Sequence, residues 1–123
     1  MPVRVVTVDD QPVFRHAARA IVDSTPGFTL VGESADGESA LELVSETHPD
    51  IVILDVRMPG IDGIEVAERL RADDPDRIIV LASSVDMTQL AELARECGAS
   101  ALVHKHWLTP RFLHGLWVAH RRG

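Results

Sequence analysis

The chain has 123 residues, 46% of them apolar, and carries 19 acidic against 12 basic side chains, for a net charge of −7. This length is that of one domain, because chains divide into separate cores only beyond roughly 250 residues, and the ordinary apolar content excludes a disordered or collagen-like chain. The acidic balance matches phosphate backbones poorly, so one domain over residues 1–123 is expected, with DNA contacted only through an output domain outside this chain.

Apolar runs of strand type alternate with segments of helical periodicity along the chain. The β-branched run 3–8 predicts a buried strand, and the fully apolar run 51–54 is typical of a parallel sheet covered on both faces. In chain order we expect a strand over 3–8, a helix over 12–24, a strand over 28–34, a helix over 36–47, a strand over 51–54, a helix over 64–71, a strand over 78–81, a helix over 87–97, a strand over 101–103 and a helix from 109 onward. Such alternation implies βαβ crossovers and therefore an α/β fold with a doubly wound, five-stranded parallel sheet.

Capping signals and apolar stripes orient the predicted helices. Asp62 with Glu65, and Asp86 with Gln89, have the spacing of a capping box, and Thr109 suits the N-cap of the last helix. The first helix has its apolar residues at helical spacing, and these predict its buried stripe: Val13, Ala17, Ala20 and Ile21.

Polar side chains follow the ends of four predicted strands. Asp9 and Asp10 close the first strand, Asp55 the third, Ser83 the fourth and Lys105 the fifth. Because the carboxyl ends of parallel strands meet at one edge of the sheet, we expect these side chains to lie together. Three carboxylates need a cation, and an all-oxygen site suits Mg²⁺. The hydroxyl and the ammonium would then donate to an anion, which predicts a phosphoryl site.

Lys105 supports that interpretation, because the other eleven basic residues are all arginine. A lysine ammonium is a compact point charge of the kind that a phosphoryl pocket requires.

Taken in order, these residues resemble the receiver domain of bacterial two-component response regulators. The motifs that carry the resemblance are Asp9-Asp10, Asp55, Met58-Pro59-Gly60, Asp62-Gly63, Ser83 and Lys105. The resemblance implies a flavodoxin-like (βα)5 fold with strand order 2-1-3-4-5. It also implies a phosphoprotein that takes part in phosphorelay signal transduction.

The resemblance assigns a role to each acidic residue. Asp55 is expected to accept a phosphoryl group from a sensor histidine kinase, with Mg²⁺ as the required cofactor. Asp10 and the backbone carbonyl of Arg57 are expected to bind the metal together with Asp55, and Asp9 to act largely through water.

Ser83 is expected to be the switch hydroxyl and Lys105 the contact to the phosphoryl oxygens. Phosphorylation would then alter the surface formed by the fourth helix, the fifth strand and the fifth helix, which also offers a homodimer interface. The output is an attached domain or a partner protein and most simply controls transcription. Such a receiver is no enzyme beyond its own phosphoryl transfer and dephosphorylation.

Three positions depart from the family pattern, and two more bear on how long the phosphoryl group stays. Leu102 replaces the usual aromatic residue of the switch strand, and Ser84 replaces the usual alanine after the hydroxyl. His106 after the lysine resembles regulators with a LuxR-like helix-turn-helix output. Arg57 and Val85, two residues beyond the acceptor and the hydroxyl, offer no general base to water, which predicts a long-lived acyl phosphate.

Other readings of the same residues stay open. The chain could be a stand-alone receiver, or a receiver-like module that binds proteins without phosphorylation. A haloacid-dehalogenase-like phosphatase is a weaker alternative, because its general acid would stand where this chain has Arg57. Asp10 could simply cap the first helix.

The remaining polar and aromatic residues suit ordinary surface and core positions. His16, His104 and His106 fit a surface better than a zinc site, since no cysteine stands at ligand spacing. Trp107 is the candidate for an exposed contact, whereas Trp117 is expected to pack on the sheet, as is Phe112. The single cysteine, the short apolar runs and the lack of a signal-peptide pattern predict a cytoplasmic location and no membrane partner.

Overall fold

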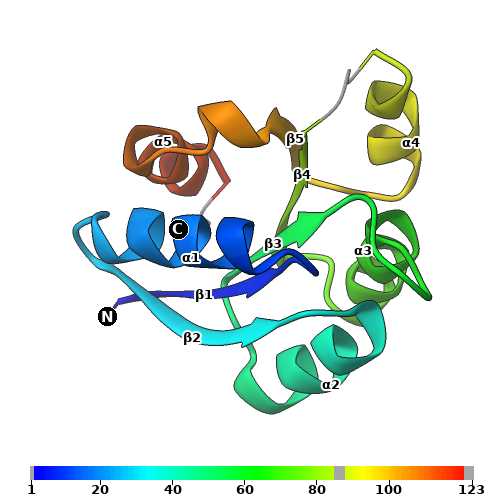
Figure 1. Ribbon diagram of the computed structural model, residues 1–123, viewed down its shortest axis with the longest axis horizontal. Helices are drawn as coiled ribbons and strands as arrows, with labels where there is room; N and C mark the ends of the chain where they lie inside the picture. The colour runs from blue at the N-terminus through cyan, green and yellow to red at the C-terminus, as the bar shows by residue number, and fades with distance from the viewer. Residues whose placement is uncertain (1, 85–87, 121–123) are drawn as a thin grey trace.

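A five-stranded parallel sheet forms the centre of the computed structural model, which describes residues 2–84 and 88–120 (Figure 1). The strand order is β2-β1-β3-β4-β5, and each neighbouring pair is parallel. The elements in chain order are β1 (Val3–Val8), α1 (Pro12–Asp23), β2 (Phe28–Ser34), α2 (Gly37–Thr47), β3 (Ile51–Asp55), α3 (Gly63–Asp73), β4 (Ile78–Ser83), α4 (Leu90–Glu96), β5 (Ala101–His104), the 3-10 turn η1 (Lys105–Trp107) and α5 (Pro110–His120). The predicted fold class and strand order are confirmed.

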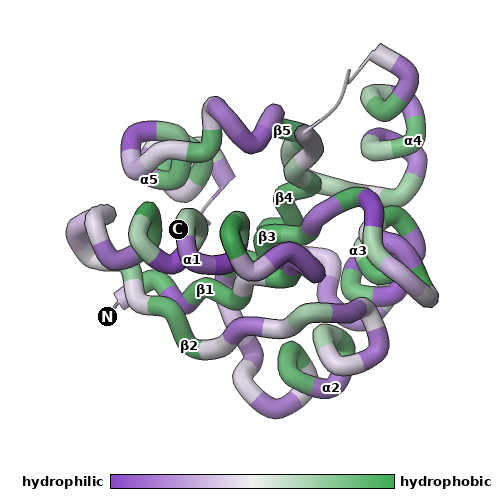
Figure 2. Tube along the Cα trace, viewed as in Figure 1, coloured by the Kyte–Doolittle hydropathy of each residue, from purple (hydrophilic) through white to green (hydrophobic). Residues whose placement is uncertain are grey.

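Helices cover both faces of the sheet, as the apolar strands require. On one face, Val5 of β1 packs in a core shared with Val22 of α1 and Leu113 of α5. On the other face, Val6 packs in a core with side chains of α2, α3 and α4, Val44 among them. Figure 2 shows hydrophobic residues along β3 and β4, two of the three interior strands of the sheet. In the described part of the chain, no helix has the length and apolar content that a membrane span needs.

The capping predictions hold for α3 and α5. The Asp62 carboxylate accepts a hydrogen bond from the backbone N–H of Glu65 at 2.9 Å. The Thr109 hydroxyl accepts one from Phe112 at 3.1 Å, in front of α5. The prediction for the fourth helix is wrong in its start. α4 begins only at Leu90, and its N-cap residue Gln89 makes no capping bond. The proposed capping residue Asp86 lies outside the described residues.

The predicted buried stripe of α1 is wrong for three of its four residues. Val13, Ala17 and Ala20 are exposed, Val13 to 72%, whereas Ala18 and Val22 are buried. The helix is therefore rotated relative to the predicted stripe: Phe14 borders the core, and of the predicted residues Ile21 packs against it. Both stripes have helical spacing, and the contact with β1 and α5 selects the one that carries the larger side chains.

One strand end differs from the sequence prediction in a way that affects the site. β5 ends at His104, and Lys105 is the first residue of η1 rather than the last of the strand. The His104 ring accepts a hydrogen bond from the backbone N–H of His106 at 3.1 Å, which caps this turn. The chain thus bends at the lysine, and the bend directs it toward α5.

Candidate functional site

The carboxyl ends of β1, β3 and β4 meet at one edge of the sheet and position the acidic site. Asp9 directly follows β1, and its backbone N–H donates to the carbonyl of Ser34 at 3.0 Å. Asp55 is the last residue of β3 and pairs in register with Ala82 of β4. Parallel pairing therefore carries two carboxylates that are 46 residues apart in the chain to the same end of the fold.

Asp9, Asp10 and Asp55 form an acidic triad, in which carboxylate oxygens of all three lie within 4.8 Å of one another. Asp9 and Asp55 are buried, and Asp10 is the more exposed member. Asp10 does not cap α1, because the N-cap residue there is Gln11 and makes no side-chain bond. Three carboxylate donors at this spacing fit a hard, oxygen-binding cation such as Mg²⁺.

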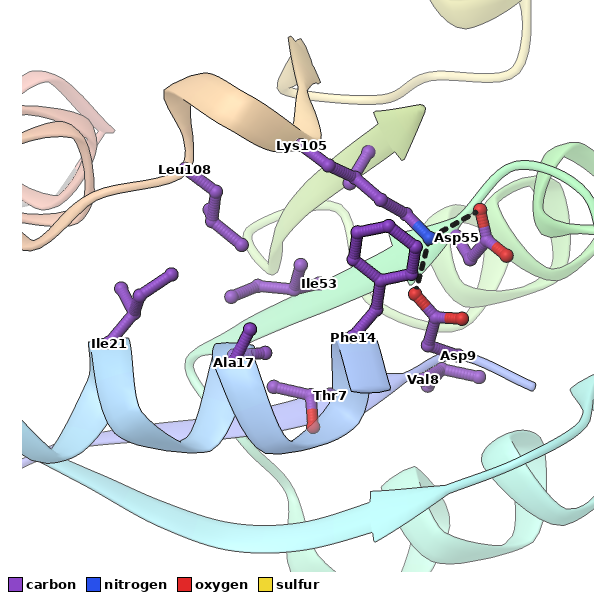
Figure 3. A pocket seen from close by; sticks show the side chains of 12 residues that line it. Thr7, Val8, Asp9, Phe14, Ala17, Ile21, Ile53, Asp55, Lys105 and Leu108 are labelled. Atoms are coloured by element: carbon purple, nitrogen blue, oxygen red, sulfur yellow. Dashed lines mark hydrogen bonds and ion pairs between the residues drawn. The ribbon is translucent and has the colours of Figure 1, made fainter. Parts of the chain in front are cut away.

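Lys105 reaches into the triad from η1 (Figure 3). Its Nζ lies 2.6 Å from Oδ2 of Asp9 and 3.5 Å from Oδ1 of Asp55, and the side chain is only 8% exposed. The sequence analysis predicted that these residues lie close together, and they do. It did not predict that Lys105 is closer to Asp9 than to Asp55. One ammonium against three carboxylates leaves the site negative, so an added cation would be attracted.

The electrostatics of the site act most strongly on Asp55. Burial, and after it the negative charge of Asp9, raise the pKa of its carboxyl group to about 6. Lys105 and the backbone N–H of Arg57 act in the opposite direction. The carboxylate is therefore ionised at neutral pH while being less stabilised than an ordinary aspartate.

The other predicted site residues surround this centre. Ser83 ends β4, is 2% exposed and pairs in register with His104 beside Lys105. Arg57 is exposed in the loop after β3, and Ser84 is exposed after β4. Val85, which the sequence interpretation assigned to the control of hydrolysis, lies outside the described residues.

Gly63 is a site residue whose importance the sequence analysis did not recognise. It opens α3, and its backbone N–H donates to the carbonyl of Val56 at 2.9 Å. A Cβ atom at this position would overlap the carbonyl oxygen of Asp55. The start of α3 is thus pressed against the end of β3. The Asp62-Gly63 pair was the available signal, because only glycine permits so close an approach of two backbones.

Phe14 was also missed, and no sequence signal distinguished it from an ordinary core residue. Its ring lies under the ammonium of Lys105, with Nζ 3.8 Å from the ring centroid (Figure 3). α1 supplies this ring, so Lys105 is contacted from α1 as well as from β3 and the residue that follows β1.

The aromatic and histidine residues outside the triad occupy the surface and the core. Trp107 is 72% exposed, in agreement with the prediction, and Trp117 packs partly buried against the sheet, as does Phe112. The rings of His104 and His106 are stacked, with centroids 4.8 Å apart. Among residues 2–84 and 88–120, the acidic triad is the one group of three or more side chains placed to hold a metal ion.

Comparisons with known proteins agree with this geometry. The family model described as "Response regulator receiver domain" matches residues 5–116. The chain is 39% identical over 105 residues to a protein-glutamate methylesterase/protein-glutamine glutaminase of Myxococcus xanthus, a match that covers 85% of this chain and 30% of that protein. It is 37% identical over 103 residues to the probable transcriptional regulatory protein NarL of Mycobacterium tuberculosis, with 84% of this chain and 48% of that protein covered.

A solved structure extends the comparison to the fold. A two-component response regulator of the LuxR family from Aurantimonas superposes with a TM-score of 0.88 at 31% identity, covering 98% of this chain and 89% of that one. The chain thus spans less than half the length of the two curated relatives and nearly all of the solved chain.

Proposed function

The chain belongs to the response regulator receiver domain family, and from that premise we propose that it is a switch in which Asp55 accepts a phosphoryl group from a sensor histidine kinase. Receiver domains are signalling modules of two-component systems. The matches to methylesterases cover 30% of one such protein, so the enzymatic activity in those names does not transfer to this chain.

The position of Asp55 is the observation that carries the proposal. Its carboxylate is buried beside Asp9 and Lys105, and burial holds its pKa near 6. A carboxylate in such surroundings is ionised at neutral pH but poorly solvated, which favours attack on phosphorus. In the transfer, an Asp55 oxygen forms the new bond to phosphorus, the bond from phosphorus to the kinase histidine nitrogen breaks, and that nitrogen keeps the electron pair.

The acidic triad would hold the magnesium ion that this reaction requires. Asp10, Asp55 and the backbone carbonyl of Arg57 are the proposed direct ligands, and Asp9 is proposed to act through water. When bound, Mg²⁺ supplies positive charge that offsets the charge of the phosphoryl oxygens. The support for this assignment is the all-carboxylate donor set and the net negative charge of the site.

Lys105 and Ser83 are the proposed readers of the phosphoryl group. The ammonium lies 3.5 Å from the Asp55 carboxylate, so a phosphoryl group added there comes within reach of its N–H donors. Ser83, at the end of the neighbouring strand, would donate its hydroxyl to another phosphoryl oxygen. Lys105 opens η1 and Ser83 precedes α4. A movement of either side chain toward the phosphoryl group would therefore be transmitted to the surface of α4, β5 and α5.

The proposed output is transcription, through a helix-turn-helix domain or a partner protein. Relatives named as transcriptional regulators support this, as does the LuxR-family structure, which covers 98% of this chain. His106 directly after Lys105 was the sequence feature that pointed the same way. Pairing of two copies through the α4-β5-α5 surface is part of the same proposal.

The direct test is phosphorylation of the protein by acetyl phosphate with Mg²⁺, read by intact mass. The parent is expected to gain one phosphoryl group, Asp55→Asn none, and the exposed control Asp23→Asn as much as the parent. A parent that gains no phosphoryl group would instead support a module that binds proteins without phosphorylation. Turnover of a phosphate ester without a stable adduct would support the phosphatase alternative.

A further inference from the structure

Among the described residues, the ammonium of Lys105 contacts an aromatic ring as well as two carboxylates. Nζ lies 2.6 Å from Asp9 and 3.5 Å from Asp55, on the side of the acidic triad. On another side it faces the ring of Phe14, 3.8 Å from the ring centroid. A cation within about 6 Å of a ring face is attracted by the negative face of the aromatic quadrupole. The ring is therefore an electrostatic partner of the lysine as well as a packing surface.

The surroundings of Phe14 add to this contact. The ring lines a cavity of about 40 Å³ together with Lys105, Asp9 and Asp55, and the rest of the lining is largely apolar and includes Ile21, Ile53 and Leu108 (Figure 3). The ring and the ammonium therefore meet where apolar side chains border the charged triad. Because a cation–π contact is worth more where water is excluded, this location strengthens the attraction between Phe14 and Lys105.

We propose that Phe14 is a positioning residue for Lys105, holding the ammonium between Asp9 and Asp55 so that it is ready to contact a phosphoryl group. This inference rests on the proposed role of Asp55 as the phosphoacceptor. A lysine side chain has a flexible four-carbon stem, and its shorter ion pair is with Asp9 rather than with the acceptor. The ring adds an attraction that does not depend on which carboxylate the ammonium contacts.

The physical reason lies in the different directionality of the two contacts. The bond from Nζ to Asp9 is short and directional, so it weakens when the ammonium turns to a phosphoryl oxygen. Attraction to the face of a ring is broad, because it comes from a quadrupole spread over six carbons. Lys105 can therefore exchange Asp9 for the phosphoryl group without losing Phe14.

The test uses the fact that Lys105 is the only lysine of the chain, so labelled lysine gives a single ε-methylene NMR signal. Phe14→Leu removes the aromatic face but keeps an apolar side chain, and Phe14→Tyr retains the ring. Leu108→Val is the matched control, since Leu108 lines the same cavity and is 8% exposed. Each variant is titrated with beryllofluoride in excess Mg²⁺, and separately with Mg²⁺ alone.

In the parent, the ring is expected to shift the Lys105 signal upfield. Phe14→Leu should move the signal toward that of free lysine and weaken beryllofluoride binding by roughly fivefold, with Mg²⁺ affinity unchanged. Phe14→Tyr should restore both, and Leu108→Val should alter neither. The proposal would be overturned if the Lys105 signal of Phe14→Leu stayed where it is in the parent. It would also be overturned if Leu108→Val changed the signal and the beryllofluoride affinity as Phe14→Leu does.

Failure of the proposed function has a different signature. A parent that binds no beryllofluoride would contradict the role of Asp55 as phosphoacceptor. The lysine signal in metal-free protein would then still decide whether Phe14 holds Lys105. Its return toward free lysine in Phe14→Leu would support the contact, and an unchanged position would overturn it.

Discussion

The two ends of the sheet each bury one cation beside carboxylates, and the comparison shows how burial separates a reactive site from a structural one. At the carboxyl end, Lys105 lies 2.6 Å from Asp9, whose side chain is only 10% exposed. At the amino end, the Arg77 side chain is 3% exposed, but its acidic partners Asp73 and Asp74 lie 3.6 Å away and are 72% and 40% exposed. The cations are alike in burial, whereas the carboxylates are not.

This difference in the carboxylates has a chemical consequence. Around Arg77 the aspartates keep their water, and the guanidinium Nε also donates to the carbonyl of Pro49 at 3.3 Å, which fixes the arginine as an anchor. Around Lys105 the aspartates have lost their water, and burial raises the pKa of Asp55 to about 6. Of these two sites, the one at the carboxyl end therefore has carboxylates whose negative charge is poorly solvated. Such carboxylates would be available to bind a metal ion or to attack a phosphoryl group.

Close packing at the carboxyl end predicts the largest effect. Gly63→Ala places a methyl group on the carbonyl oxygen of Asp55 and should lower the free energy of unfolding by about 3 kcal/mol. Gly115→Ala is the control, because a Cβ there meets no atom within 4 Å. It should raise stability by about 0.5–1 kcal/mol. Urea unfolding measures both, and equal effects would contradict the close approach of α3 to β3.

Removing one carboxylate from the triad should produce the next largest effect. Asp10→Asn takes away a proposed metal ligand and should weaken Mg²⁺ binding by at least about 100-fold. Without metal, the same variant should be more stable than the parent, because like-charge repulsion falls. Calorimetric titration and metal-free unfolding test the two parts, with Asp74→Asn as the control at the amino end. Unchanged Mg²⁺ affinity in Asp10→Asn would refute the assignment.

The raised pKa of Asp55 predicts a pH dependence of stability with a definite sign. The folded chain binds a proton at about pH 6, whereas the unfolded carboxyl does so near its ordinary value of 3.8. The folded state therefore holds more protons in this window, and stability rises as pH falls from above 6 toward 4.

Between pH 7.5 and 5 this contribution amounts to about 1 kcal/mol in metal-free protein. Asp55→Asn should lose it, and so should the parent in excess Mg²⁺, which binds the ionised carboxylate. Unfolding curves at the two pH values decide the point. A parent and an Asp55→Asn variant with the same pH dependence would show that Asp55 is not the group concerned.

The smallest effect is expected at the amino end. Asp73→Asn removes an exposed partner of Arg77 at 3.6 Å and should change the free energy of unfolding by less than about 0.5 kcal/mol. Asp74, the second partner, still pairs with the guanidinium, and its Nε still donates to the carbonyl of Pro49. Thermal unfolding measures the change. If Asp73→Asn lowered the free energy of unfolding by more than about 1 kcal/mol, the two ends of the sheet would differ less than the exposures of their carboxylates imply.

The sequence by itself determined the strands, their order along the chain and the polar residues at or just after their ends. Runs such as 51–54 have the apolar continuity of a doubly covered parallel strand, and that pattern is local. Asp9, Asp10, Asp55 and Lys105 could be brought together because parallel strands place their carboxyl ends at one edge. These inferences needed no knowledge of how any side chain is oriented.

Only the tertiary structure decided which face of α1 is buried, where α4 begins and what Lys105 contacts. Val13 and Phe14 both belong to stripes of helical spacing, and contacts with distant elements choose between them. Gly63 is needed because a Cβ atom there would overlap the carbonyl oxygen of Asp55 on β3. Lys105 lies closer to Asp9, at 2.6 Å, than to Asp55, at 3.5 Å. Local periodicity fixes what an element is, because it arises from neighbours along the chain. Its rotation and its close contacts depend on residues that are far away in sequence.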